Sequence, residues 1–140
     1  MMKHITIIAS GQRISSWHII GHANEVMQYT NDASSTSKEG LMITSTTSRI
    51  IIYDCNTGAH LDDITSAIQS IVDSDSEIYL DGCHTAQSSK WIGSTSTDIA
   101  REMSKIVNCI VSGNTGFVLF PYVGWFTLGD KQSYWKGIAE

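Results

Sequence analysis

The sequence predicts an α/β domain in which helices flank a mostly parallel β-sheet, with a β-hairpin insertion. Helical and strand-like hydrophobic patterns alternate from residue 61 to the C-terminus, which is typical of parallel strands joined by helices. Two strand-like segments, "LMITS" and "RIIIYD", lie only three residues apart before that region and predict the hairpin. The 140 residues, 41% of them hydrophobic, are enough to bury the core of a single domain over residues 1–140.

The N-terminal half reads mainly as strands. Residues 5–9 form a β-branched run typical of a buried strand, and "SWHIIG" at residues 16–21 predicts a second strand that ends at His22. The segment "ANEVMQYT" fits a short helix or a hairpin arm equally well, because its hydrophobic period matches neither pattern. The polar, glycine-terminated segment "NDASSTSKEG" predicts a loop.

The C-terminal half alternates between helix and strand. Hydrophobic residues from position 61 recur at i, i+3, i+7, i+10 and i+11, which predicts one apolar helical stripe made of Leu61, Ile64, Ile68, Ile71 and Val72. Asp62 and Asp63 would then lie in the first turn, where carboxylates suit the helix dipole. "EIYLD" predicts a strand, residues 97–107 a second helix, and "CIVSG" and "GFVLFPYVGWF" the closing strands.

Composition excludes several classes of function. The net charge is −5 and the nine basic residues are scattered, which argues against a nucleic-acid partner. Three cysteines without a repeating spacing indicate a reducing compartment, so we expect a cytoplasmic protein. No hydrophobic run approaches a transmembrane length, and "MMKHITIIAS" is too short for a secretory signal. Export by a route without a classical signal stays open.

Cys83 is the candidate nucleophile. It stands in "SEIYLDGCHTAQSS", where an apolar strand runs into Gly82-Cys83 and a hydroxyl-rich loop. Ligands of α/β sheets bind at the carboxyl ends of the strands, and backbone N–H groups at such a turn can form an oxyanion hole. The alternative is an inert buried thiol, since free cysteine is among the most buried residue types.

His22 is the candidate base for Cys83. It ends a strand in "HIIGHAN" and would lie at the same sheet edge. His84 is adjacent to Cys83 and would point to the opposite face of an extended segment. The other three histidines have structural interpretations: His4 and His18 in strands, and His60 at a helix start. A loop histidine of no consequence remains the alternative for His22.

A strand ending in "GH", an amphipathic helix, a strand ending in "GC", a helix and a further strand resemble the caspase-like (clan CD) cysteine peptidases. The nearest branch contains the autoprocessing protease domains of bacterial toxins. The resemblance rests on "EIYLDGCHTA", "TDIAREMSKIV" and "NCIVSGNTG", and it covers residues 61–118, with residues 16–23 added by motif.

The resemblance implies a His22–Cys83 dyad that cleaves a peptide bond through a thioester, with the backbone at Gly82 and Ala23 serving the oxyanion site. The family usually has Gly after its His, so Ala23 is a departure that still retains an N–H. No metal and no cofactor is implied. The partners would be a protein or peptide substrate and, beyond it, a protein partner or a second copy, with no membrane. A bacterial toxin or effector domain would reach a host cell by a non-classical route.

Three other interpretations stay open. "GFVLFPYVGWF" is either a core or edge strand, with Pro121 favouring an edge or a bulge, or a wall of the substrate pocket. Cys55, His60, Cys83 and His84 could ligate zinc, although the C-x2-C spacing of structural sites is missing. The chain could also be a non-catalytic caspase-like binding module, because "GQRISS" is too short to hold a helix between the first two strands.

Overall fold

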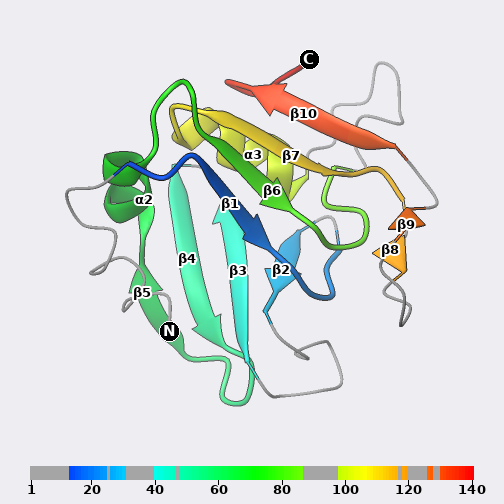
Figure 1. The fold of residues 1–140 in the computed structure, drawn as a ribbon. Coiled ribbons are helices and arrows are strands. Elements are labelled where there is room, and N and C mark those ends of the chain that lie inside the picture. Colours follow the sequence, from blue (N-terminus) through cyan, green and yellow to red (C-terminus); the bar gives the residue numbers. More distant parts are fainter. Residues whose placement is uncertain are drawn as a thin grey trace.

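The computed structural model describes residues 13–24, 26–30, 40–46, 48–86, 98–116, 118–119, 126–127 and 130–140. The strand predicted at residues 5–9, the loop predicted at residues 31–39 and most of "GFVLFPYVGWF", including Pro121, lie outside these ranges. Figure 1 shows two sheets in the described part of the chain. One helix lies behind the upper sheet, which contains the strand labelled β7, and the other lies beside the left end of that sheet.

The first sheet has five strands and carries the candidate site. Its order is β1 (Ser16–Ile19), β6 (Glu77–Leu80), β7 (Ile110–Asn114), β10 (Lys131–Trp135) and β11 (Ile138–Ala139). The pairs β1–β6 and β6–β7 are parallel, whereas β7–β10 and β10–β11 are antiparallel. The three parallel strands are those predicted from "SWHIIG", "EIYLD" and "CIVSG".

The second sheet has four strands, all antiparallel. Its order is β2 (Met27–Tyr29), β3 (Leu41–Thr46), β4 (Arg49–Asp54) and β5 (His60–Asp63). The predicted hairpin is confirmed as β3 and β4, and "ANEVMQYT" contributes a hairpin arm, β2, rather than a helix. The short strands β8 (Val118–Leu119) and β9 (Phe126–Thr127) form a separate antiparallel pair.

The predicted fold class, a mostly parallel sheet flanked by helices, is wrong. The described residues form mainly strands in mixed and antiparallel sheets, with two short helices, α2 (Thr65–Ile71) and α3 (Ile99–Ile106). Residues 60–63, predicted as the start of a helix, pair with β4 instead, because its open edge offers hydrogen-bond partners. Leu61 of the predicted stripe is accordingly exposed, and Asp62 and Asp63 lie in β5 rather than in a first helical turn.

Helix α3 begins where a buried carboxylate caps it. The Asp98 side chain accepts a hydrogen bond of 2.8 Å from the backbone N–H of Arg101, the usual N-cap contact. Its second oxygen accepts one of 3.1 Å from the hydroxyl of Tyr134, which lies in β10. The cap therefore fixes the helix to the C-terminal strands, which the sequence analysis did not predict.

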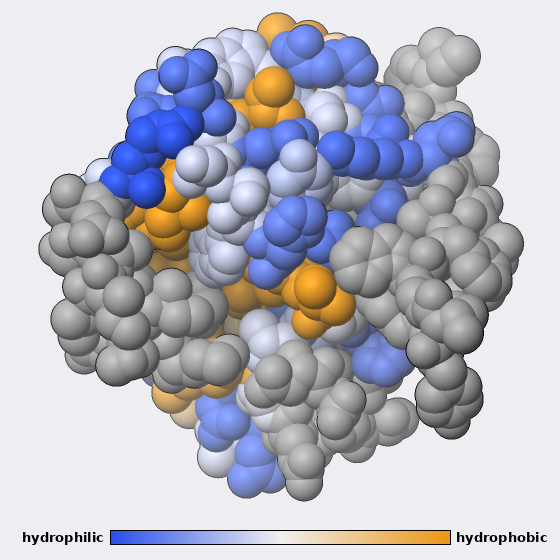
Figure 2. Space-filling model, in the orientation of Figure 1, coloured by the Kyte–Doolittle hydropathy of each residue, from blue (hydrophilic) through white to orange (hydrophobic). Residues whose placement is uncertain are grey.

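One hydrophobic core joins both sheets and both helices. Its buried members include Ile19, Ile78, Leu80, Val111 and Tyr134 from the first sheet, Ile43, Ile50 and Ile52 from the second, Ile64, Ile68 and Ile71 around α2, and Ile99, Ala100 and Met103 from α3. Side chains alternate across a strand, so the first sheet turns a different set outward. Figure 2 shows this outer face as largely blue and white, with few hydrophobic patches.

Candidate active site

The strands β1 and β6 end side by side at one edge of the first sheet. Ile19 pairs in register with Leu80, and the backbone N–H of Asp81 donates to the carbonyl oxygen of Ile19 at 2.9 Å. The chain therefore leaves both strands at the same level, into residues 20–23 on one side and residues 81–86 on the other. These are the two segments that carry His22 and Cys83.

Gly82 brings the two segments into direct contact. A Cβ atom placed on Gly82 would lie 2.2 Å from the Cβ of Ala23 and 2.9 Å from the carbonyl oxygen of Gly21. Both distances are too short for any side chain, so glycine is required for the approach. The structure thus places Gly82 against the loop that contains Ala23 and His22.

A tight hairpin holds the segment around His22. The N–H of Tyr29 donates to the carbonyl of His22 at 2.8 Å, and the N–H of Asn24 donates to the carbonyl of Met27 at 3.0 Å. Ala23 faces Gln28 between these two bonds. The side chain of His22 is exposed, so its imidazole is open to solvent and to an approaching substrate.

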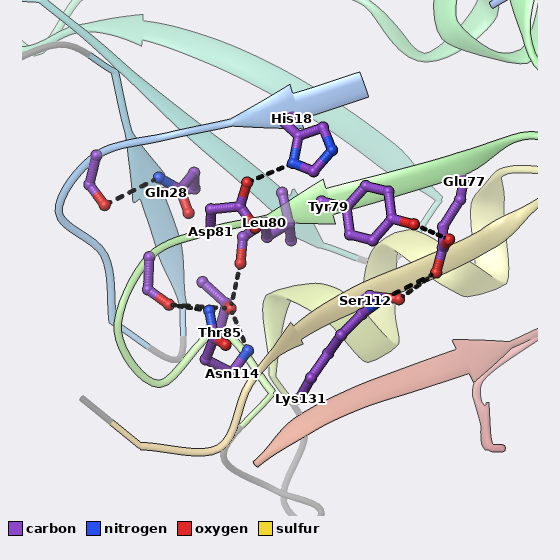
Figure 3. A network of polar contacts seen from close by, with 12 residues as sticks. His18, Gln28, Glu77, Tyr79, Leu80, Asp81, Thr85, Ser112, Asn114 and Lys131 are labelled. Carbon is purple, nitrogen blue, oxygen red and sulfur yellow. Dashed lines mark hydrogen bonds and ion pairs between the residues drawn. The ribbon is translucent and has the colours of Figure 1, made fainter. Parts of the chain in front are cut away.

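A hydrogen-bonded turn holds the half-buried Cys83. The hydroxyl of Thr85 donates to the carbonyl of Leu80 at 2.9 Å and accepts the N–H of Asn114 at 3.1 Å. The side-chain amide of Asn114 donates to the carbonyl of Gly82 at 3.2 Å (Figure 3). His84 adopts a left-handed backbone conformation at φ 60°, which is uncommon for a residue other than glycine.

A groove of about 270 Å³ opens beside this turn on the outer face of the sheet. Its lining residues come from β1, β6, β7 and β10 and the turns that follow them: His18, Tyr79, Asp81, Ser112, Gly113, Asn114 and Lys131. Asp81 and Asn114 line the groove and also border the turn, since Asp81 precedes Gly82 and Asn114 binds its carbonyl. The groove therefore reaches the segment that carries Cys83.

His18 and Asp81 form a close pair in the groove. The Nδ1 atom of His18 lies 2.6 Å from a carboxylate oxygen of Asp81, and the imidazole stacks on the Tyr79 ring at 4.2 Å between centroids. We predicted a structural role for His18 because it lies in a strand, yet its ring is on the open face. Figure 3 shows the pair at one end of a row of polar side chains that runs past Tyr79 to Glu77.

Glu77 organises the other end of that row. Its carboxylate accepts hydrogen bonds from the hydroxyls of Tyr79 and Ser112, the latter at 2.8 Å, and lies 3.6 Å from the ammonium of Lys131. Burial alone would raise the pKa of Glu77, but these contacts outweigh it and hold the pKa below its usual 4.5. The hydrogen bond to Glu77, with burial, raises the pKa of Tyr79 to about 12.

The other two cysteines lie apart from this site. Cys109 is fully buried, and desolvation raises the pKa of its thiol to about 11, which makes it a poor nucleophile near neutral pH. Cys55 follows β4 of the second sheet, and His60 lies in β5 rather than at a helix start. Among the described residues, no group of three or more His, Cys, Asp or Glu side chains is placed to hold a metal ion.

Several residues of the site were not predicted from the sequence, among them Asp81, Asn114 and Gln28. Asp81 and Asn114 both follow or end a buried strand as polar residues, in "IYLD" and "IVSGN", and that signal could have identified them. Gln28 gave no such signal, because its role depends on how β2 meets the first sheet.

The comparisons with known proteins found no match: neither a family model, nor a curated protein, nor a solved structure is significantly similar to this chain. Within the described ranges, no helix is both long and apolar enough to cross a membrane.

Proposed function

We propose that the protein is a cysteine peptidase with His22 and Cys83 as its catalytic dyad. The observation that carries the proposal is the contact of Gly82 with Ala23, which joins the two loops that bear a histidine and a cysteine at one sheet edge. Ligands of α/β sheets bind outside the carboxyl ends of parallel strands, and β1 and β6 are parallel and end together here. The half-burial of Cys83 and the exposure of His22 are compatible with a thiol that substrate can reach.

The reaction follows from the chemistry of the two side chains. His22 would accept the thiol proton of Cys83, and the sulfur would bond to the carbonyl carbon of the scissile peptide. Collapse of the tetrahedral intermediate breaks the C–N bond, and His22 returns the proton to the leaving amine. Water then attacks the thioester, which releases the acid and restores the thiol. The backbone N–H groups of Cys83 and Ala23 would stabilise the oxyanion at both stages.

The groove supports a preference for a basic residue near the scissile bond. Asp81 contributes a carboxylate directly before Gly82, and only one of its oxygens contacts His18. Glu77 adds a second negative charge, and Lys131 is already paired with it. A guanidinium or ammonium group would therefore find a carboxylate oxygen that His18 does not contact, with which it could form a charge-assisted hydrogen bond.

The resemblance in the motifs around Cys83 extends the proposal to a bacterial toxin or effector domain. Such a domain would act on a protein or peptide in the cytoplasm, or after non-classical secretion into a host cell. Self-association or a protein partner would be compatible with this role. These parts of the proposal rest on the motifs alone.

Labelling with peptidyl chloromethyl ketones tests the dyad. We expect the wild type to be labelled at Cys83, with no labelling in Cys83→Ala and labelling slowed about 100-fold or more in His22→Ala. A probe carrying Arg beside the reactive carbon should react faster than one carrying Glu, and Asp81→Asn should reduce that difference. Cys55→Ala is the matched control and should label as the wild type does.

The alternative is a non-catalytic binding module. Ala23 replaces the glycine usual in the resembling family, and the fold departs from the helix-flanked sheet that we expected. Equal labelling of native wild type, Cys83→Ala and His22→Ala would reject the peptidase and favour this alternative.

A further inference from the structure

Gln28 is a fully buried polar residue in the three-residue strand β2. Its side-chain nitrogen donates to the carbonyl of Tyr29 at 2.8 Å and to the carbonyls of Gly21 and His22, each at 3.4 Å. Three carbonyl oxygens around one nitrogen define the orientation of the amide, because carbonyls only accept hydrogen bonds. The side chain therefore reaches from the second sheet to the backbone of Gly21 and His22. Figure 3 shows Gln28 and one of its hydrogen bonds.

The oxygen of the Gln28 amide faces the other loop. It lies 2.7 Å from the position that a Cβ atom on Gly82 would occupy. It is buried and has no hydrogen-bond partner among the described residues. An unsatisfied buried acceptor is unfavourable, and an apolar side chain of similar size would fill the same space without that cost. The reason for a glutamine at this position must therefore lie in the hydrogen bonds that its nitrogen donates.

Asn114 makes the equivalent contact on the Cys83 side. Its side-chain nitrogen donates to the carbonyl of Gly82 at 3.2 Å, and both groups are buried. A side-chain amide thus binds the carbonyl of residue 22 from β2, and another binds the carbonyl of residue 82 from β7. In each case the bound carbonyl lies in the same peptide group as the N–H of a proposed oxyanion donor.

The trans geometry of the peptide group links these contacts to the oxyanion site. The C=O of one residue and the N–H of the next point in opposite directions. Because Gln28 and the N–H of Tyr29 bind the His22 carbonyl, the N–H of Ala23 points away from β2. Because Asn114 binds the Gly82 carbonyl, the N–H of Cys83 points away from Asn114.

We infer that Gln28 and Asn114 are positioning residues, which orient the N–H groups of Ala23 and Cys83 as the two oxyanion donors. The inference rests on the proposed peptidase function. Gln28 is fully buried and does not reach the groove, whereas Asn114 also lines it. Each side chain acts on its donor through one peptide plane. Asn114 should have the larger effect, because the N–H of Tyr29 also holds the His22 carbonyl at 2.8 Å. The second contact of the Gly82 carbonyl is longer, 3.4 Å from the Thr85 hydroxyl, which donates mainly to Leu80 at 2.9 Å.

Two reactions of Cys83 separate this role from a general structural one. Iodoacetamide alkylates the thiolate by displacement of iodide at a saturated carbon, so no oxyanion develops. With p-nitrophenyl acetate the sulfur bonds to the acetyl carbon, an oxyanion forms, and p-nitrophenolate leaves with the electrons of the broken C–O bond. Water later converts the thioester to acetate and the free thiol. Only the second reaction needs the donors.

The variants are Asn114→Leu and Gln28→Met, with rates for Cys83→Ala subtracted. We expect acylation by p-nitrophenyl acetate to slow about 30-fold or more in Asn114→Leu and about 5-fold or more in Gln28→Met. Alkylation by iodoacetamide should stay within about 2-fold of the wild type in both. Gln132→Met is the matched control, because Gln132 also donates to the carbonyl of the next residue, at 2.8 Å, and its second hydrogen bond goes to the carbonyl of Glu140.

The outcomes distinguish the inference from the function on which it rests. If wild-type Cys83 does not react faster with the ester than Cys83→Ala, the peptidase proposal fails and the inference fails with it. If wild type reacts but both reactions slow equally in the variants, or neither slows, the peptidase stands and the positioning role is rejected. Circular dichroism checks folding, and Asn114→Ala and Gln28→Leu, which remove the donor without burying a charge, replace a variant that does not fold.

Discussion

At the scale of single residues, Gly82 determines whether the candidate site can form. Its missing side chain lets the Cys83 turn lie against Ala23, and any Cβ there would overlap both Ala23 and the amide oxygen of Gln28. The same position precedes the candidate nucleophile in sequence. A glycine is therefore required by the contact between two loops, in addition to any flexibility it gives the turn.

Gly82→Ala should push the two loops apart. We expect a loss of stability of about 1–3 kcal/mol from overpacking and a strong reduction in labelling of native Cys83. The double variant Gly82→Ala with Ala23→Gly removes the shortest overlap and should recover part of both. Thermal unfolding and peptidyl chloromethyl ketone labelling measure the two effects.

Gly58→Ala is the control for this substitution. Gly58 has a φ of 71° and no atom within 4 Å of its Cβ position, so alanine there costs about 1 kcal/mol of backbone strain far from Cys83. Labelling of Cys83 in Gly58→Ala should match that in the wild type. Unchanged labelling in Gly82→Ala would mean that the loop contact has no part in the reactivity of Cys83.

At the scale of elements, a polar network ties together three strands of the first sheet. The Glu77 carboxylate of β6 binds Ser112 of β7, whose hydroxyl lies 2.7 Å from that of Ser133 in β10. Lys131 of β10 reaches over the Tyr79 ring, 4.3 Å from its centroid. The network takes the place of apolar packing on this face of the sheet, so its stability should depend on pH.

Glu77→Gln should destabilise the protein by about 1–2 kcal/mol at neutral pH, because hydrogen bonds to a charged group are lost. The pKa of Glu77 is lower in the folded chain than in the unfolded one, so its contribution is present above about pH 4.5 and is lost as the pH falls through the lower folded value. The difference between wild type and variant should therefore shrink below pH 4.5. Urea unfolding across this range measures it.

Tyr79 provides a second measurement of the same network. Its pKa of about 12 means that the protonated phenol favours folding below pH 10 and that this contribution is lost as the pH rises toward 12. In Glu77→Gln, the pKa of one tyrosine, measured by ultraviolet absorbance, should fall from about 12 toward 10. Glu140→Gln, an exposed glutamate at the C-terminus, should change neither result. The network would be contradicted if Glu77→Gln changed neither the stability of the protein below pH 4.5 nor the pKa of any tyrosine.

At the scale of the whole molecule, the two sheets depend on a single core. Ile43 of the second sheet and Val111 of the first belong to the same buried cluster, together with residues of α2 and α3. Helix α3 is capped by Asp98, whose second oxygen binds Tyr134 of β10. Because the apolar faces cover one another, neither sheet has an independent core to keep it folded.

Ile43→Ala should therefore destabilise both sheets together, by about 2–5 kcal/mol. Cys109, buried directly before β7, reports on the first sheet, because its thiol is protected until that sheet opens. We expect its pulse labelling to follow the loss of the circular dichroism signal in one urea transition. Ile138→Ala, at a side chain that is 68% exposed, should have little effect. Protection of Cys109 that persists after the rest has unfolded would show two separate units.

Local patterns predicted those elements whose side chains follow one simple periodicity. The strands β1, β6 and β7, the hairpin of β3 and β4, and helix α3 arise where the sequence analysis places them. The stripe from Leu61 was wrong at its start, because the edge of β4 recruits residues 60–63 into a strand. Strand β10 was missed, because "KQSYW" buries only Tyr134 fully and shows no run of hydrophobic residues.

The sequence by itself determined the two motifs at the ends of β1 and β6, since a glycine followed by a histidine or a cysteine after an apolar strand is a local signal. Only the tertiary structure decided that the sheet is mixed, that a second antiparallel sheet shares its core, and that Gln28, Asp81 and Asn114 border the Cys83 turn. The reason is physical: strand direction, partner choice and buried hydrogen bonds depend on residues far apart in the chain, and no local periodicity records them.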